Sequence, residues 1–571
     1  MRQAGLLLAL ILLATVFGSA TAAGQAAPPG GAALRGAVVA PQLQRQLDAA
    51  AQNEMIRAIV VLRPQADLTS VRGLARENRP GAAARILRAR ADLTQRPLRA
   101  LLRLRRAQGL VSDIAPLWIV NAIAVTATPA VIRELAARQE VRAIRPDLVV
   151  PAPPAPPAVA TPATAETNVA LVNAPALWDL GYRGQGIVVA NMDTGVDVTH
   201  PDLATRWRGG TNSWYDPNGE HPTAPTDVSG HGTWTMGVMV GGDAGGTSVG
   251  IAPDATWIAV KIFNDQGTAT STGIHQGFQW LLDPDSDPAT ADAPDVVNDS
   301  WGMSASGCLP DFQPDLASLR AAGILPVFAA GNYGPLPGNS SSPANNPEAF
   351  AVGATDDADV LYPYSSRGPS PCGQPVYPQL VAPGVDIHTT DLYGLYADPT
   401  GTSVAAPHVA GALALLLQAF PGMSADRQAA ALESGAADLG AAGADNDYGY
   451  GRLDALAAYQ WLAATPDFAL SVSPSSVTVR RGKTARYTVA VSVTGDFAGE
   501  VSLTVAGLPN GTKAIFWPNP AGSPGSATLR VRTKPWTRRG AYTLLITGTS
   551  GSLVHNATAT LTVRRNPTPA G

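Results

Sequence analysis

The sequence predicts an α/β protein in which a parallel sheet carries helices on both faces. A small α+β unit precedes it and an all-β sandwich follows it. Between Thr167 and about Pro466, short strands rich in β-branched residues alternate with helical stretches, which is typical of parallel sheets. Residues 37–150 mix the two patterns, and after Asp467 the helices stop and period-two alternation takes over. The 571 residues allow three or four domains.

The N-terminal sequence predicts where in or outside the cell the protein acts. Arg2 is followed by the apolar run Leu6–Phe17 and then by small residues that include Ala20-Thr21-Ala22. Twelve apolar residues are too few to span a bilayer, so residues 1–22 are interpreted as a signal peptide of a secreted, extracellular protein. Because no later stretch reaches 18 uninterrupted apolar residues, we expect no transmembrane anchor.

The first folded unit is expected at residues 37–150. Its elements are a strand at Ile56–Leu62, an Arg-rich helix at Leu74–Leu104, a strand at Trp118–Thr128, a helix at Pro129–Arg138 and a strand at Val141–Val150. Residues 151–166 contain PAPPAPPAVATPATA, a composition typical of a stiff, polyproline-like linker.

The parallel-sheet unit is expected at residues 167–465. Its predicted strands are Ile187–Met192, Trp257–Phe263, Asp295–Ser300 and Ile324–Ala330. Its predicted helices are Thr272–Leu282, Asp315–Ala322 and Ser403–Ala419.

The sandwich is expected at residues 467–565, where turns such as Pro509-Asn510-Gly511 separate alternating segments. Its predicted strands are Val477–Val479, Ala485–Val493, Val501–Val505, Ala527–Thr533, Tyr542–Gly548 and Ala557–Val563. About 100 residues of this pattern favour two packed sheets.

The formal net charge of −4 is the sum of very unequal segments. Residues 31–150 carry +10, residues 151–466 carry −24 and residues 467–571 carry +9. A basic segment before a strongly acidic one indicates intramolecular attraction. A nucleic-acid partner would need a basic patch together with a reading motif, and no such motif occurs, so we expect no nucleic-acid partner. Two cysteines without a Cys/His cluster exclude a structural zinc site.

Four short motifs in the acidic unit carry chemistry. Asp193 ends the strand in VVANMDTGVDVTHPD, His231 lies in GHGT, Asn332 in AAGN and Ser403 in GTSVAAPHVAG. A serine hydroxyl becomes a good nucleophile when an imidazole takes its proton, and a carboxylate on the other ring nitrogen fixes the tautomer. Ser403 is expected at a helix start, where free backbone N–H groups can bind an oxyanion. The Asn332 amide offers a second donor.

These motifs, in this order, resemble the subtilisin-like serine peptidases, and the bacillopeptidase F-like branch among them. The resemblance covers residues 167–465 and extends to the WIAVKIF, VVNDSWG and LVAPGV segments. It implies a secreted endopeptidase that hydrolyses peptide bonds through an acyl-enzyme, with Asp193, His231 and Ser403 as the triad and Asn332 as the oxyanion donor. Residues 37–150 resemble the family's inhibitory, folding-assisting propeptide, so the resemblance also implies a self-processed precursor.

The resemblance also places the substrate. Thr268 and Ala269 match one backbone edge of the cleft, and Ser300-Trp301-Gly302 match the other. An extended protein or peptide substrate would then add as a middle strand between them. The base of the primary pocket is expected from Ser342-Pro343-Ala344, which favours small or apolar residues before the scissile bond. The charge of −24 instead favours cationic substrates, so the specificity stays open.

Other polar residues are interpreted as structural. His408 is expected to pack within its helix, His200 and Asp202 to cap a turn, and Asp299 to point away from the cleft and order the local backbone. The chemistry requires no cofactor. In relatives the residue matching Asp202 often helps to hold calcium, but the loop Gly241–Gly250 lacks the asparagine-containing insertion that completes such a site. We therefore leave open a structural calcium site elsewhere in the acidic domain and assign it no ligands.

Cys308 and Cys372 are expected to form a disulfide, because a lone pair of cysteines in a secreted protein is usually bridged. We expect a monomer.

Two other functions compete with a broad endopeptidase. One is an adhesion or carbohydrate-binding protein in which the parallel-sheet unit is only a scaffold, with the basic sandwich as the binding module. For that module, Phe516-Trp517 and Trp536 are either core residues or a ligand platform. The other is a processing enzyme of narrow specificity. The intact set of four motifs favours the broad endopeptidase.

Overall fold

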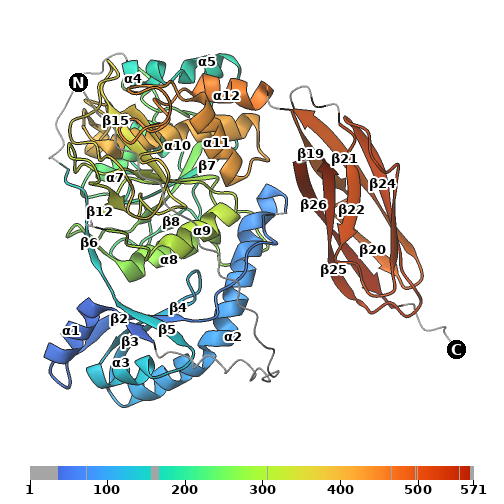
Figure 1. Ribbon diagram of the computed structural model, residues 1–571, viewed down its shortest axis with the longest axis horizontal. Coiled ribbons are helices and arrows are strands. Elements are labelled where there is room, and N and C mark those ends of the chain that lie inside the picture. Colours follow the sequence, from blue (N-terminus) through green and yellow to red (C-terminus); the bar gives the residue numbers. More distant parts are fainter. Residues whose placement is uncertain are drawn as a thin grey trace, which may run out of the picture.

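The computed structural model describes residues 37–72, 74–155, 166–304, 307–464, 466–494, 497, 499–551 and 553–565. The predicted signal peptide and residues 156–165 of the predicted linker lie outside them. Figure 1 shows three units, with a parallel-sheet unit between an N-terminal α+β unit and a separate β-sandwich.

The parallel-sheet unit is built on a seven-stranded sheet in the order β16-β15-β13-β11-β7-β9-β8, with every neighbouring pair parallel. Its strands are β7 (Val188–Asp193), β8 (Trp214–Tyr215), β9 (Thr256–Lys261), β11 (Val296–Asp299), β13 (Pro326–Ala329), β15 (Phe350–Thr355) and β16 (Leu380–Pro383). Nearly all residues of these strands are buried, as expected for a sheet covered on both faces.

Two separate hydrophobic cores lie on the two faces of this sheet. One contains α7 (His231–Val240) and α10 (Thr402–Ala419), and the other contains α8 (Ser271–Leu282) and α9 (Gln313–Ala321). The predicted α/β class with helices on both faces is therefore confirmed. Among the described helices, α10 is the one long and apolar enough to cross a membrane, and 83% of it is buried inside the protein.

Shorter elements complete this unit. Its other helices are α4 (Thr167–Leu171), α5 (Ala174–Asp179), α6 (Pro201–Ala204), α11 (Ala425–Gly435), α12 (Ala455–Ala464) and the 3₁₀ turn η2 (Leu392–Gly394). Its short strands are β10 (Thr268–Thr270), β12 (Met303–Ser304), β14 (Ser341–Ser342), β17 (Thr389–Thr390) and β18 (Tyr396–Ala397).

The N-terminal unit is a five-stranded sheet in the order β1-β5-β2-β4-β3, in which only the β1–β5 pair is parallel. Its elements are β1 (Val38–Val39), α1 (Pro41–Ala49), β2 (Ile56–Leu62), η1 (Arg76–Asn78), α2 (Arg79–Ala107), β3 (Val111–Leu117), β4 (Ala122–Ala127), α3 (Pro129–Ala136) and β5 (Val141–Pro146). The unit has its own core, and residues such as Ile59, Leu87 and Ile119 also belong to the α8–α9 core.

The strand expected at Val141–Val150 is interrupted, and this expectation was wrong. β5 ends at Pro146, which has no N–H to donate to a sheet. The following segment forms the short strand β6 (Val149–Pro151), which leaves the N-terminal sheet and pairs with β10 of the parallel-sheet unit.

The sandwich consists of two four-stranded sheets, β19-β21-β24-β23 and β20-β26-β25-β22. Its strands are β19 (Asp467–Ser473), β20 (Ser476–Arg480), β21 (Thr484–Thr494), β22 (Ser502–Ala506), β23 (Lys513–Trp517), β24 (Gly525–Arg532), β25 (Gly540–Ser550) and β26 (Leu553–Arg564). The sandwich has its own core between the sheets. The sequence patterns missed β19 and β23.

Candidate active site

Asp193 is the last residue of β7, at the carboxyl end of the sheet. Its side chain is buried, and Oδ1 accepts hydrogen bonds from the Thr194 amide at 2.7 Å and from Nδ1 of His231 at 2.8 Å. The carboxylate is thus fixed by its own backbone turn before it holds the imidazole.

His231 is the first residue of α7. With Nδ1 on Asp193, its Nε2 is left without a hydrogen-bond partner among the described residues. Gly232 is required beside it, because a Cβ there would lie 2.1 Å from the carbonyl oxygen of Gly195. This close approach lets the start of α7 reach the end of β7.

Ser403 lies in the first turn of α10, which begins at Thr402. Its Oγ donates to the carbonyl oxygen of Ser300 at 3.3 Å. Gly401 precedes the helix with φ of 150°, a conformation that glycine adopts readily and other residues avoid. The first backbone N–H groups of α10 have no partner within the helix.

Asn332 follows β13 and faces the same helix start. Its Oδ1 accepts from the Thr402 amide at 2.9 Å and from the Thr402 hydroxyl at 3.1 Å. These bonds fix the side-chain amide and leave Nδ2 as a donor beside Gly401, where a Cβ would lie 3.0 Å from it. The structure thus brings together all four residues that the sequence motifs singled out.

A chain of buried side chains connects the two helix starts. Asn298 Nδ2 donates to Asn191 Oδ1 and to Ser300 Oγ, both at 3.0 Å. Asn191 Nδ2 then donates to the carbonyl oxygen of Gly232 at 3.1 Å. At the other end, Ser300 Oγ donates to the carbonyl oxygen of Ser403 at 2.7 Å. The backbones of the Ser403 and His231 helices are therefore joined through β7 and β11.

Lys261 is a second component that the motifs did not reveal. It ends β9 beside Asp193 and is fully buried, and its Nζ donates to the carbonyl oxygen of Thr194 at 2.8 Å. It also lies 3.2 Å from Asp265. A lysine inside the apolar run of WIAVKIF was the signal, because a buried lysine needs polar partners.

The two segments expected to pair with substrate backbone lie in different surroundings. Thr268 and Ala269 lie in β10, which pairs antiparallel with β6. Ser300 is buried, and Trp301 packs its ring edge-on against Phe312 and Phe328. The Trp301 side chain therefore belongs to the core, and only its backbone is left for a substrate.

Gly302 lies against β14, where an added Cβ would be 2.2 Å from Ser341 Oγ and 3.2 Å from the carbonyl oxygen of Ser342. The segment predicted to form the pocket base, Ser342-Pro343-Ala344, therefore begins beside this edge. Its side chains are buried and carry no charge.

Asp299 does not order the local backbone as expected. Its side chain is fully buried, Oδ1 accepts from the Trp301 indole at 3.1 Å, and Oδ2 has no partner among the described residues. Burial raises the pKa of Asp299 well above its usual value; the Trp301 bond opposes this shift and the Asp193 charge adds to it.

His408 packs inside α10, as expected. Its Nδ1 contacts the Val404 carbonyl oxygen at 2.8 Å and its Nε2 contacts Asn168 at 2.9 Å. Burial lowers the pKa of His408 to about 4, partly offset by the Val404 bond.

The surroundings of Asp202 do not fit a calcium site. Its Oδ1 accepts from the Ala244 amide at 2.7 Å and its Oδ2 from the Tyr396 hydroxyl at 2.5 Å. His200 caps this short helix by accepting from the Asp202 amide. Both carboxylate oxygens of Asp202 thus already accept hydrogen bonds from the protein, instead of being free to bind a calcium ion. Cys308 and Cys372 form the expected disulfide.

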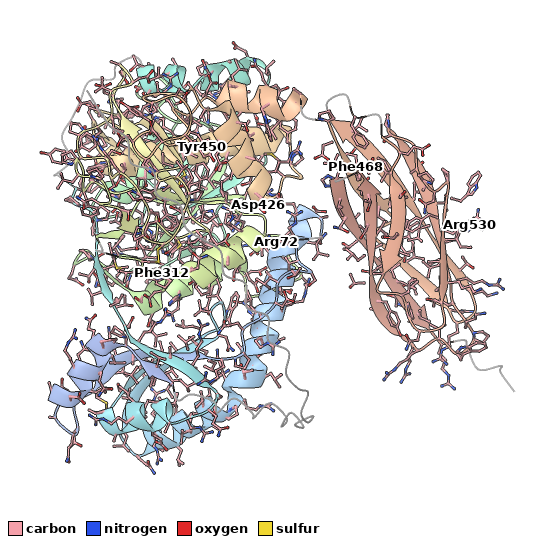
Figure 2. The ribbon with its side chains drawn as sticks, in the orientation of Figure 1. Arg72, Phe312, Asp426, Tyr450, Phe468 and Arg530 are labelled. Carbon is pink, nitrogen blue, oxygen red and sulfur yellow. A yellow bond between two sulfur atoms is a disulfide. The ribbon has the colours of Figure 1, made fainter. Side chains whose placement is uncertain are left out.

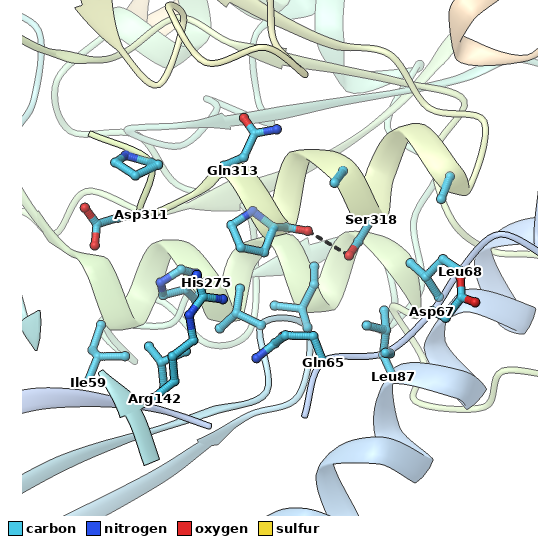
Figure 3. A pocket seen from close by; sticks show the side chains of 18 of the residues that line it. Ile59, Gln65, Asp67, Leu68, Leu87, Arg142, His275, Asp311, Gln313 and Ser318 are labelled. Carbon is cyan, nitrogen blue, oxygen red and sulfur yellow. Dashed lines mark hydrogen bonds between the residues drawn. The ribbon is translucent and has the colours of Figure 1, made fainter. Parts of the chain in front are cut away.

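Arginine–aspartate pairs connect the N-terminal unit to the parallel-sheet unit around a poorly filled interface. Their N–O distances are 2.6 Å for Arg76–Asp295, 2.7 Å for Arg88–Asp283 and 2.7 Å for Arg145–Asp311. A cavity of about 530 Å³, lined in part by Arg145 and Asp311, lies in this interface. Figure 3 shows Ile59, Gln65, Leu87 and Arg142 on one side of it and His275, Gln313 and Ser318 on the other.

Replacement of Asn298 by leucine is expected to destabilise the fold by about 1–3 kcal/mol, because the buried Asn191 Oδ1 loses its partner, while Ser300 Oγ keeps its bond to the Ser403 carbonyl oxygen. Urea unfolding of the single and double variants Asn191→Leu and Asn298→Leu measures this. Because each change already breaks the shared bond, the double variant should lose less than the sum of the singles. Strict additivity would contradict a connected chain.

Comparison with known proteins gives the same assignment. Residues 184–451 match the model of the Subtilase family, Peptidase_S8. The chain is 37% identical to bacillopeptidase F of Bacillus subtilis over 402 residues, which cover 65% of this chain and 28% of that protein. It is 33% identical to subtilisin DY of Bacillus licheniformis, covering 48% of this chain and 93% of that protein. With subtilisin of Bacillus pumilus the identity is 33%, over 51% of this chain and 98% of that protein.

The family match spans the elements that carry Asp193, His231, Asn332 and Ser403. Two relatives are covered over nearly their whole length at 33% identity. The chain belongs to the subtilase family of serine-type endopeptidases.

Proposed function

We propose that the protein is a secreted endopeptidase made as a self-processed precursor, with residues 37–150 as its inhibitory propeptide. One observation carries this proposal: the strand that leaves the N-terminal unit, β6, pairs with β10 at the edge where a substrate would add. Pro151, Val150 and Val149 lie opposite Thr268, Ala269 and Thr270, and the Ala152 amide donates to the Gly267 carbonyl oxygen at 2.8 Å.

The site supports acyl transfer as follows. Ser403 Oγ attacks the substrate carbonyl carbon while His231 Nε2 takes the hydroxyl proton, and Asp193 stabilises the imidazolium that forms. Asn332 Nδ2 and the Ser403 amide donate to the oxyanion. The imidazolium then gives its proton to the leaving amine as the C–N bond breaks. Water, deprotonated by the same imidazole, hydrolyses the acyl-enzyme and restores Ser403.

The Ser403 hydroxyl must change its hydrogen-bond partner before it can attack a substrate. This hydroxyl donates to the Ser300 carbonyl, so it must rotate towards His231 Nε2, which has no competing partner among the described residues. Catalytic hydrogen bonds are often formed fully only when substrate is bound. The uncharged surroundings of Gly302 favour small or apolar residues before the scissile bond.

The experiment that tests the proposal compares the wild type with Ser403→Ala. We expect the wild type to lose a fragment of about 150 residues, while Ser403→Ala stays full-length because it lacks the nucleophile. Gel electrophoresis with N-terminal sequencing of each band measures this and places the maturation bond. If both chains stay intact, and wild type does not react with a serine-directed fluorophosphonate, the proposal fails.

Asn332→Leu in the mature protein should lower kcat about 10²–10³-fold, the loss typical when an oxyanion-hole donor of subtilisin is removed. KM should change little, because the donor acts mainly in the transition state. Steady-state kinetics on a chromogenic peptide measures both constants. A change in KM alone would assign Asn332 to ground-state binding instead.

Inhibition by the separate propeptide should strengthen as pH falls through about 6 and weaken as pH rises above it. Burial raises the pKa of Asp283 to about 6, Arg88 opposes this, and Asp292, Asp285 and Asp287 add to it. Because burial in the complex raises this pKa on net, the complex holds a proton that the separated parts release, so this contribution favours inhibition below about pH 6 and is lost as Asp283 ionises. Inhibition constants at pH 5 and pH 8 measure the effect.

Arg88→Ala should weaken inhibition at pH 8 more than at pH 5 and so steepen the profile, because the buried Asp283 carboxylate then ionises without its partner. Arg96→Ala is the matched control, because Arg96 is exposed on the same helix α2 and has no contact with the parallel-sheet unit among the described residues. Equal pH slopes for both variants would contradict the assigned role of the Arg88–Asp283 pair.

A further inference from the structure

The outer face of the sheet β19-β21-β24-β23 collects cations in cross-strand rows. Inward residues of β21, β24 and β23 fill the core, so the alternate residues point outward. In one row Arg530 lies opposite both Ile515 and Arg486, and in the next Arg532 lies opposite Lys513. We call the outward residues Arg486, Lys513, Ile515, Trp517, Arg530 and Arg532 the cationic face.

Repulsion between like charges on the cationic face destabilises the sandwich in the absence of a partner. Arg530 opposite Arg486 and Arg532 opposite Lys513 are like-charge pairs, which destabilise a sheet. None of the four cations has an ion pair among the described residues of the chain. The whole segment 467–571 contains only three acidic residues, Asp467, Asp496 and Glu500. A surface of this kind is stabilised when an anionic partner neutralises it.

Exposed aromatic side chains flank these cations along the edge strand β23. Trp517 is 74% exposed at one end of the strand, and Ile515 is 65% exposed beside it. At the other end Trp536 is 71% exposed, and Gly511, two residues before Lys513, would place a Cβ 3.4 Å from its indole nitrogen. Phe516, by contrast, packs against the core. Lys513 and Trp517, the two ends of the strand, are roughly 13 Å apart, and Trp536 lies beyond Lys513, at Gly511.

The cationic face is directed away from the acidic parallel-sheet unit. Figure 2 shows Arg530 on the side of the sandwich opposite that unit. The contact between the two units lies instead at Asp467, which pairs with Arg427 and with His555, both at 2.6 Å. The charge of −24 in the middle segment is therefore not what neutralises these arginines.

We propose that the cationic face binds an extended polysaccharide that carries carboxylate or sulfate groups. Arginine forks pair with such groups, and indole rings stack on the apolar faces of sugar rings. Rows of exposed cations flanked by exposed indole rings suit an extended chain rather than a small ligand held in a pocket.

Binding is tested on the full-length Ser403→Ala chain with immobilised polygalacturonate, chondroitin sulfate and neutral dextran. Tight binding to one or both acidic polymers and none to dextran is expected, and the stronger acidic polymer identifies the anionic group. Arg486→Ala/Arg530→Ala should bind at least 10-fold more weakly and with a shallower dependence on salt. Trp517→Ala should bind about 5–20-fold more weakly with the salt dependence unchanged.

Arg480→Ala is the matched control, since Arg480 is exposed on β20 of the opposite sheet. It should bind like the parent. Arg486→Ala/Arg530→Ala should melt at the same temperature as the parent or higher, because it removes a like-charge pair. No binding to either acidic polymer, or equal losses in Arg480→Ala and Arg486→Ala/Arg530→Ala, overturns the proposal. Tighter binding to single-stranded DNA than to both polymers also overturns it, in favour of a nucleic-acid surface.

Discussion

The buried hydrogen bonds from Ser403 through Ser300, Asn298 and Asn191 to Gly232 set the geometry on which the site depends. The nucleophile and the base stand at the starts of two helices whose positions are otherwise set by non-directional packing. Hydrogen bonds have preferred angles, so a connected chain limits how far one helix can slide relative to the other. Removal of one amide would leave its neighbours unpaired and destabilise the fold, although Asn298 Oδ1 itself has no partner among the described residues.

The N-terminal unit is attached to this frame in a different way. Strand β6 and the arginine–aspartate pairs form directional contacts, and a cavity remains beside the apolar residues that the unit shares with the α8–α9 core. The directional contacts fix the orientation of the unit, and the cavity leaves the apolar packing between the two units incomplete. The attraction expected between the basic residues 31–150 and the acidic residues 151–466 thus corresponds to specific arginine–aspartate ion pairs in the structure.

Sequence patterns predicted the α/β class and singled out the four residues that meet at the helix starts, because strands and short motifs are local. They did not predict that β6 would leave its sheet, since that depends on an edge strand more than 100 residues later. Lys261 and Asn298 were also missed, because their roles depend on neighbours from other strands. Asp299 was misjudged for a different reason: its indole partner Trp301 is only two residues away, but the bond between them depends on how the backbone turns after β11.

The two terminal units differ in whether they share a hydrophobic core with the parallel-sheet unit. The sandwich core contains only residues from Phe468 onwards, whereas Ile59, Leu87 and Ile119 of the N-terminal unit share a core with α8 and α9. Recombination could therefore exchange the sandwich for another module by a cut near Asp467 without opening a core. The N-terminal unit has no such freedom: substitutions on its inner surface must be matched by compensating changes in α8 or α9, so these two parts of the gene are bound to diverge together.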